Sequence, residues 1–165
     1  MIILGLDPGS RVTGWGIIAP REGPRGQWRA VAWGAVRLDP GDDHPARIAE
    51  AHAAISAVIA EHRPVMAAIE SPFMGENAMS ALKLGQVRGA LILTCKLGGL
   101  TVREFAPRLV KQAATGYGNA DKAQVARMVA LQLGLQKPPT PADAADALAI
   151  ALTGAHAPRE MIGRR

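Results

Sequence analysis

Four carboxylates occupy positions at which this chain could assemble a site for chemistry. Asp7 directly follows the apolar run 2–6, and Glu70 directly follows the apolar run 65–69. Asp143 and Asp146 lie three residues apart at the start of an Ala-rich segment, so a helix would present both on one face. Like charges at that spacing repel each other by about 0.2–0.5 kcal/mol in an isolated helix. A partner of opposite charge is therefore expected.

Divalent cations are the partner that such oxygen ligands favour. Mg²⁺ and Mn²⁺ are commonly held by a few carboxylates together with water and substrate phosphate. Four carboxylates suit two ions roughly 3.5–4 Å apart, an arrangement that drives in-line displacement at phosphorus. The residue types therefore predict metal-dependent hydrolysis of a phosphodiester, with no Ser, Cys or His nucleophile.

Each acid also has a structural explanation when it is taken alone. Asp143 stands in a first helical turn, where Asp is favoured by the helix dipole. Asp7 opens an Asp-Pro-Gly turn sequence, and Glu70 could be a solvated strand end. Asp146 lies deeper in the apolar segment, where no capping role explains it. The joint arrangement of two strand-terminal acids and a paired acid on a late helix favours a shared site.

Apolar periodicity predicts the elements that would carry these acids. Short apolar runs indicate strands and the 3.6-residue period indicates helices. Strands are expected at 2–6, 12–19, 30–38, 65–69 and 100–105, and helices at 44–63, 77–97, 107–114, 120–133 and 142–155. A right-handed crossover would lay the two acid-ended strands parallel, with their carboxyl ends about 5 Å apart. The order predicts an α/β fold with a mixed five-stranded sheet flanked by helices.

Composition indicates one soluble domain without an export signal or a membrane span. The 165 residues suit a single domain over 1–165, with a disordered tail expected from about residue 156. The lone Cys95 lies in an apolar run, which favours a buried thiol and a reducing cytoplasm. The net charge of +5 is a weak pointer to nucleic acid on its own. It becomes a stronger one if several acids are committed to metal.

Longer motifs connect these acids to a known family. They are Asp7-Pro8-Gly9-Ser10, Glu70 closely followed by Phe73-Met74, the segment 80–89 (Ser-Ala-Leu-Lys-Leu-Gly-Gln-Val-Arg-Gly), Val110-Lys111-Gln112 and the segment 143–151. Together they resemble the RuvC family of Holliday-junction endonucleases. The matching motifs run in order from residue 2 to about residue 155, and the segment 80–89 is the most specific of them.

The resemblance implies an RNase H-like fold and a homodimer that acts in DNA recombination and repair. Such an enzyme binds a four-way DNA junction and nicks two opposite strands symmetrically, leaving 5′-phosphate and 3′-hydroxyl ends. The resemblance also implies branch-migration proteins as partners. It assigns Asp7, Glu70, Asp143 and Asp146 as ligands of two Mg²⁺ or Mn²⁺ ions. Some members of the family have His at the place of Asp143.

Further residues are assigned to catalysis or DNA by the same resemblance. Phe73 matches an aromatic residue that engages bases at the junction centre, and its alternative is a core or dimer-contact ring. Lys111 and Lys122 match catalytic lysines near the scissile phosphate that also contact DNA. Lys83 and Arg88 are additional candidates for DNA contact. Without the family match, each lysine would be read as an ordinary solvated residue.

Three alternative functions are compatible with parts of the pattern. Actin-like ATPases also open on a strand, an Asp and a Gly-containing turn, but they need two such domains, which 165 residues cannot hold. A nuclease of the same fold could act on RNA or on another branched DNA by the same mechanism. A DNA-binding module could have kept the fold and lost catalysis, although the presence of all four acids argues against it.

Overall fold

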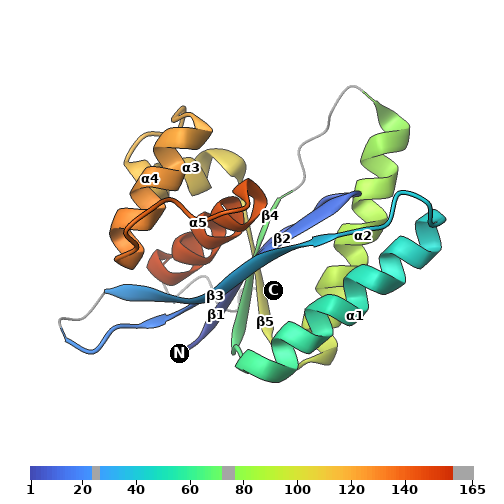
Figure 1. Ribbon diagram of the computed structural model, residues 1–165, viewed down its shortest axis with the longest axis horizontal. Helices are drawn as coiled ribbons and strands as arrows, with labels where there is room; N and C mark the ends of the chain where they lie inside the picture. Colours follow the sequence, from blue (N-terminus) through green and yellow to red (C-terminus); the bar gives the residue numbers. More distant parts are fainter. Residues whose placement is uncertain (24–26, 72–76, 158–165) are drawn as a thin grey trace.

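The chain folds into a sheet with helices on both faces (Figure 1). The computed structural model describes residues 1–23, 27–71 and 77–157. The strands are β1 (Ile3–Asp7), β2 (Val12–Pro20), β3 (Trp28–Arg37), β4 (Met66–Glu70) and β5 (Thr101–Phe105). The helices are α1 (His44–His62), α2 (Ala78–Leu97), α3 (Pro107–Thr115), α4 (Lys122–Leu133) and α5 (Ala142–His156).

The sheet is mixed, as the sequence predicts. Its strand order is β3-β2-β1-β4-β5. β1, β2 and β3 form an antiparallel meander, whereas β4 pairs in parallel with both β1 and β5. Helices α1 and α2 cover one face, and α3, α4 and α5 cover the other (Figure 1). The predicted five-stranded sheet flanked by helices is confirmed.

Most predicted boundaries differ from the structure by at most one residue, and the two that are wrong by two residues each have a local cause. β3 begins at Trp28 and not at residue 30, because Trp28 pairs with Pro20 across the hairpin and buries its ring. α4 begins at Lys122 and not at residue 120, because Asp121 caps it. The Asp121 carboxylate accepts from the Gln124 backbone at 2.8 Å, and the Gln124 side chain accepts from the Asp121 backbone at 3.0 Å.

Side-chain alternation along β4 decides which face Glu70 occupies. Met66 and Ala68 belong to the apolar core beneath α3, α4 and α5, whereas Ala67 and Ile69 belong to the core beneath α1 and α2. Successive side chains of a strand point to opposite faces. Glu70 therefore directs its carboxylate toward the α5 side of the sheet.

Strand register brings the first two predicted acids together. β1 and β4 are parallel neighbours, and their last paired positions are Leu6 and Ile69. The next residues along the two strands are Asp7 and Glu70, at the carboxyl ends where each strand leaves the sheet. Both side chains lie on the α5 face by the same alternation.

Helix α5 lies directly against the backbones of β1 and β2. A Cβ added at Gly5 would stand 2.0 Å from the carbonyl oxygen of Ala147, and one added at Gly14 would stand 2.1 Å from that of Asp143. Neither position can hold a side chain without displacing backbone. This close approach brings the start of α5, with its two acids, over the end of β1.

The lone cysteine is buried, as the sequence predicts. Cys95 is a free thiol buried in the core beneath α1 and α2, and burial raises its pKa to about 12. Of the helices in the described part of the chain, none has the length and apolar character needed to span a membrane.

Gly5→Ala should destabilise the protein, because the new methyl group meets the Ala147 carbonyl of α5. We expect the free energy of unfolding to fall by about 1–3 kcal/mol or more. Gly16→Ala is the matched control, since its Cβ would first meet side-chain atoms of Leu148, at 2.7 Å, which can shift more easily. Urea denaturation of both variants checks this. Equal stability of Gly5→Ala and the unmodified protein would contradict the close packing.

Candidate active site

The carboxyl ends of β1 and β4 border a cavity of about 240 Å³. Asp7, Glu70 and Asp146 contribute carboxylates to its lining, and Lys111 and Lys122 contribute ammonium groups. The apolar part of the wall consists of Pro107, Val110, Val125 and Ala149. The structure therefore brings five of the six residues predicted as catalytic to one cavity.

Three helices carry the remaining site residues to the strand ends. Lys111 lies on α3, which begins at Pro107 directly after β5. Lys122 is the first residue of α4, whose start is set by the Asp121 cap. Asp146 lies on α5, one turn beyond Asp143. Asp143 does not line the cavity, although its charge acts on the acids that do.

Burial and nearby negative charges raise the pKa values of Asp7 and Glu70. The pKa of Asp7 is raised to about 7, first by desolvation and then by the negative charges of Asp146 and Glu70. Asp143 adds to this rise in the pKa of Asp7, and Lys122 opposes it. The pKa of Glu70 is also raised, by burial and then by Asp146. The acids of α5 thus reach both strand ends electrostatically, and together with Asp7 and Glu70 they form one electrostatic cluster centred on Asp7.

Lys122 supplies positive charge within this cluster. Its Nζ donates to the Asp146 carboxylate at 2.8 Å, and that contact raises the pKa of Lys122. The rest of the Lys122 side chain is exposed. An exposed ion pair contributes little to stability, at most about 1 kcal/mol. Its larger consequence is that Lys122 lowers the pKa of both Asp7 and Glu70.

The acids fit a divalent cation by donor type and by charge. All are oxygen donors, which hard cations prefer, and a bound cation would relieve the repulsion that raises the pKa of Asp7. Within residues 1–23, 27–71 and 77–157, however, no three His, Cys, Asp or Glu side chains are arranged to enclose a metal ion as they stand. The Asp146 carboxylate, which a cation could use, accepts from the Lys122 ammonium in this structure.

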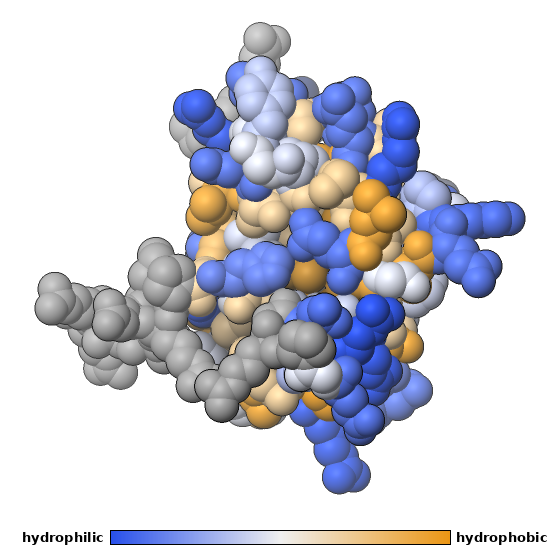
Figure 2. Space-filling model, turned by 90° about the vertical axis from the view of Figure 1, so that its left-hand side faces the viewer, coloured by the Kyte–Doolittle hydropathy of each residue, from blue (hydrophilic) through white to orange (hydrophobic). Residues whose placement is uncertain are grey.

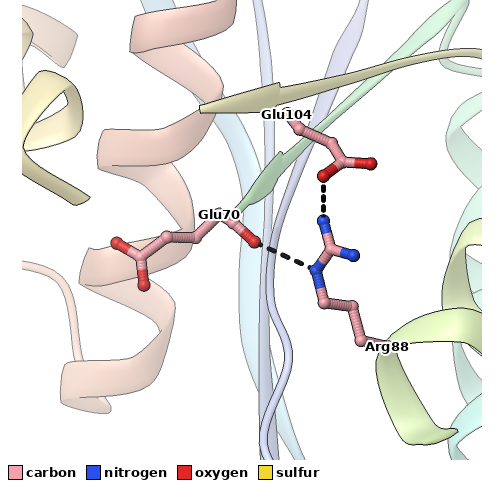
Figure 3. A network of polar contacts seen from close by, with 3 residues as sticks. All are labelled: Glu70, Arg88 and Glu104. Carbon is pink, nitrogen blue, oxygen red and sulfur yellow. Dashed lines mark hydrogen bonds and ion pairs between the residues drawn. The ribbon is translucent and has the colours of Figure 1, made fainter. Parts of the chain in front are cut away.

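Lys83 and Arg88, two further predicted DNA-contact residues, do not line the cavity. Lys83 is exposed on α2, across the sheet. Arg88, also on α2, donates from Nε to the Glu70 carbonyl oxygen at 3.2 Å and pairs with the Glu104 carboxylate (Figure 3). Phe73 lies outside the described residues. The DNA-contact roles of these three residues stay predictions.

Sequence reasoning missed Glu104 and the apolar wall of the cavity. Glu104 is the penultimate residue of β5, so it resembles a third acid near a strand end. The buried Phe105 beside it points into the core beneath α5, and alternation therefore sends Glu104 to the α2 side. The alternation of side chains along β5 is the sequence feature that could have placed Glu104 on the α2 face, opposite the acids of the cavity.

Asp7→Asn should stabilise the metal-free protein at high pH. The pKa of Asp7 is about 7 in the folded chain and 3.8 as a model value, so the folded state binds more protons between these values and stability falls as pH rises. Three pKa units correspond to at most ~4 kcal/mol, and solvent screening leaves about 1–3 kcal/mol. Chemical denaturation with chelator should show this gain at pH 8 and none near pH 4. A variant less stable at pH 8 would contradict the electrostatic cluster.

Comparison with known proteins agrees with this geometry. Residues 3–154 match the model of the family described as crossover junction endodeoxyribonuclease RuvC. The Chlorobium phaeovibrioides enzyme of that name is 47% identical over 152 residues, which cover 92% of this chain and 79% of the relative. The Thermus thermophilus RuvC structure superposes with a TM-score of 0.85 at 35% identity, covering 94% of this chain and 93% of that one. The structure of T. thermophilus RuvC in complex with a Holliday junction substrate superposes with a TM-score of 0.84 at 33% identity, and it likewise covers 94% of this chain and 93% of that one. The chain belongs to the RuvC family of crossover junction endodeoxyribonucleases, and its fold is RNase H-like.

Proposed function

We propose that this protein is a metal-dependent endonuclease that resolves four-way DNA junctions by nicking two opposite strands. The products would carry 5′-phosphate and 3′-hydroxyl ends. The observation that carries the proposal is the convergence of Asp7, Glu70 and Asp146 with two lysines in one cavity at the carboxyl ends of β1 and β4. The Thermus relative of similar structure binds a Holliday junction, which supports the choice of substrate.

The acids and the lysines of the site have separate roles in this reaction. Asp7, Glu70, Asp143 and Asp146 would hold two Mg²⁺ or Mn²⁺ ions, which when bound supply activation of the attacking water and stabilisation of the leaving oxygen. Lys111 and Lys122 project cations into the same cavity, where they can stabilise the charge that develops on the phosphate.

Phosphate binding would extend beyond the cavity over α3 and α4. Figure 2 shows this side of the molecule, where hydrophilic side chains surround a smaller apolar area. Arg108 and Arg127 are exposed here in addition to Lys122. Contacts from such cations to phosphates would provide affinity for DNA without base specificity. Phe73 and Lys83 are further DNA contacts that the family resemblance proposes.

The substrate symmetry calls for a homodimer, and α2 offers a surface for it. Met79, Leu82, Leu93 and Leu97 are exposed on this helix at spacings that form one stripe. A Cβ added at Gly85 or Gly89, within the stripe, would meet no described atom within 4 Å. An apolar stripe with glycines at its centre suits close packing against the same helix of a second copy.

The proposed cellular setting is the cytoplasm, together with branch-migration proteins that act on the same junctions. The buried, free Cys95 is compatible with a reducing compartment.

Asp7→Asn should separate binding from cleavage. Loss of an interaction that only orients a metal ligand already costs about 10–100-fold, so loss of a ligand should lower the nicking rate by at least about 100-fold. Junction affinity in Ca²⁺ should not fall, because it depends on contacts between cations and phosphates. Nicking of a synthetic four-way junction in Mg²⁺ and gel-shift binding measure the two quantities.

Glu61→Gln is the matched control for Asp7→Asn, since it also converts an acid to its amide. Glu61 is exposed near the end of α1, which leads into the opposite end of β4. The Glu61→Gln variant should cleave the four-way junction normally. Parallel assays on double-stranded RNA and on forked DNA distinguish a junction resolvase from a nuclease with another substrate. If Asp7→Asn lost junction binding together with cleavage, this would contradict the proposal that Asp7 serves cleavage and that other residues bind the junction.

The double variant Leu82→Glu/Leu93→Glu should be monomeric. Both side chains are 57% exposed, so charging them costs the monomer little and places like charges across the proposed contact. Sedimentation should show the unmodified protein as a dimer and the variant as a monomer with an unchanged melting temperature. Leu131→Glu, on α4 and 71% exposed, is the control that should stay dimeric. A monomeric unmodified protein, with or without junction DNA, would contradict the proposed dimer.

A further inference from the structure

We propose that Arg88 is a positioning residue, which holds the carboxyl end of β4 and thereby orients the Glu70 carboxylate from the opposite face of the sheet. The inference rests on the proposed function, because it takes Glu70 to be a metal ligand. It assigns Arg88 a role in metal binding that involves no contact with metal, substrate or DNA.

The contacts of Arg88 reach the site through backbone. Its Nε donates to the Glu70 carbonyl oxygen at 3.2 Å, and a terminal nitrogen of the same guanidinium pairs with the Glu104 carboxylate. Figure 3 shows that Arg88 approaches from α2, whereas the Glu70 carboxylate points away from it toward α5. Arg88 therefore contacts the peptide that carries the carboxylate and leaves the carboxylate free to face the cavity.

The end of β4 is where such a restraint is needed. Strand pairing with β5 ends at Glu70, and one further bond joins the Ser71 backbone N–H to the Phe105 carbonyl at 2.8 Å. The bond from Arg88 to the Glu70 carbonyl adds a restraint at this last paired position of β4, on the peptide from which the carboxylate projects. Bonds that hold a ligand from behind commonly set the orientation on which metal affinity depends.

Arginine suits this position better than lysine. A guanidinium is a rigid planar fork, so one group can donate to two acceptors in fixed directions. Here the fork joins three elements, because Arg88 lies on α2, Glu70 on β4 and Glu104 on β5. Lysine could neutralise Glu104, but its single ammonium lacks a donor at the place of Nε.

A direct contact between Arg88 and DNA phosphate is the competing explanation. The side chain of Arg88 is 13% exposed, against 47% for Glu104, and its guanidinium is already engaged by two acceptors. A phosphate would have to compete with both. A phosphate contact would also appear in the salt dependence of junction binding, which a positioning role would leave unchanged.

The test compares Mn²⁺ affinity, measured by calorimetry without DNA, in the full-length protein and in four variants. Arg88→Met removes both bonds, and Arg88→Lys keeps the charge opposite Glu104. Glu104→Gln is the matched control, because the amide oxygen can still accept from Arg88 and the bond to Glu70 stays. Glu70→Gln is the reference for loss of the ligand itself. Melting temperature and the salt dependence of junction affinity in Ca²⁺ are measured for each variant.

We expect Arg88→Met and Arg88→Lys to weaken Mn²⁺ binding by roughly 10–100-fold. Glu104→Gln should retain most of the affinity, and the salt dependence should stay unchanged in all of them. Unchanged Mn²⁺ affinity in Arg88→Lys, with a loss in Glu70→Gln, would overturn the positioning role alone. A salt slope reduced by about one, with normal Mn²⁺ affinity, would also overturn it and favour a phosphate contact. If Arg88→Met does not fold, the Mn²⁺ affinity of Arg88→Lys decides whether Arg88 positions Glu70. Normal Mn²⁺ affinity in Glu70→Gln would overturn this inference together with the ligand assignment.

Discussion

The direct contact between α5 and the backbones of β1 and β2 is the constraint on which the site depends. Asp7 leaves the sheet at the end of β1, and Asp146 can join it only if α5 approaches the strands without side chains between them. Gly5 and Gly14 permit this, since any Cβ there would stand about 2 Å from a helix carbonyl. Alanines such as Ala147 and Ala151 complete the close packing from the helix side. Small residues far from the chemistry thus set the spacing of the acids.

The same packing creates an electrostatic cost that the protein must offset. Carboxylates brought together and desolvated raise one another's pKa, as the value of about 7 for Asp7 shows. In the metal-free chain the offset comes from Lys122, which donates to Asp146 and lowers the pKa of Asp7. A divalent cation would provide a stronger offset, and it would have to compete with that ammonium. The clustered carboxylates thus lower the stability of the metal-free protein, and the same cluster is what allows the site to bind positive charge.

Positions that depend on local pattern were predictable from the sequence. Asp7 and Glu70 each end an apolar run, and the right-handed crossover rule predicts that their strands are parallel neighbours, as β1 and β4 are. The spacing of Asp143 and Asp146 likewise indicated a shared helix face. The close approach at Gly5 was not predictable, because its partner Ala147 lies far along the chain and a glycine within an apolar run does not indicate which element will cover it.

Arg88 shows the same limit for a side chain whose partners are distant in sequence. Its segment resembles the family motif, which favoured a DNA contact, whereas the structure pairs it with Glu104 and the Glu70 carbonyl. Glu70 connects the two faces of the sheet, because its carbonyl accepts from Arg88 on the α2 side while its carboxylate points toward α5 (Figure 3). One face holds the acids of the cavity, and the other presents the exposed stripe of α2. One guanidinium on α2 thus bonds directly to the peptide that carries the Glu70 carboxylate, so the packing of α2 on the sheet and the placement of this strand end are not independent.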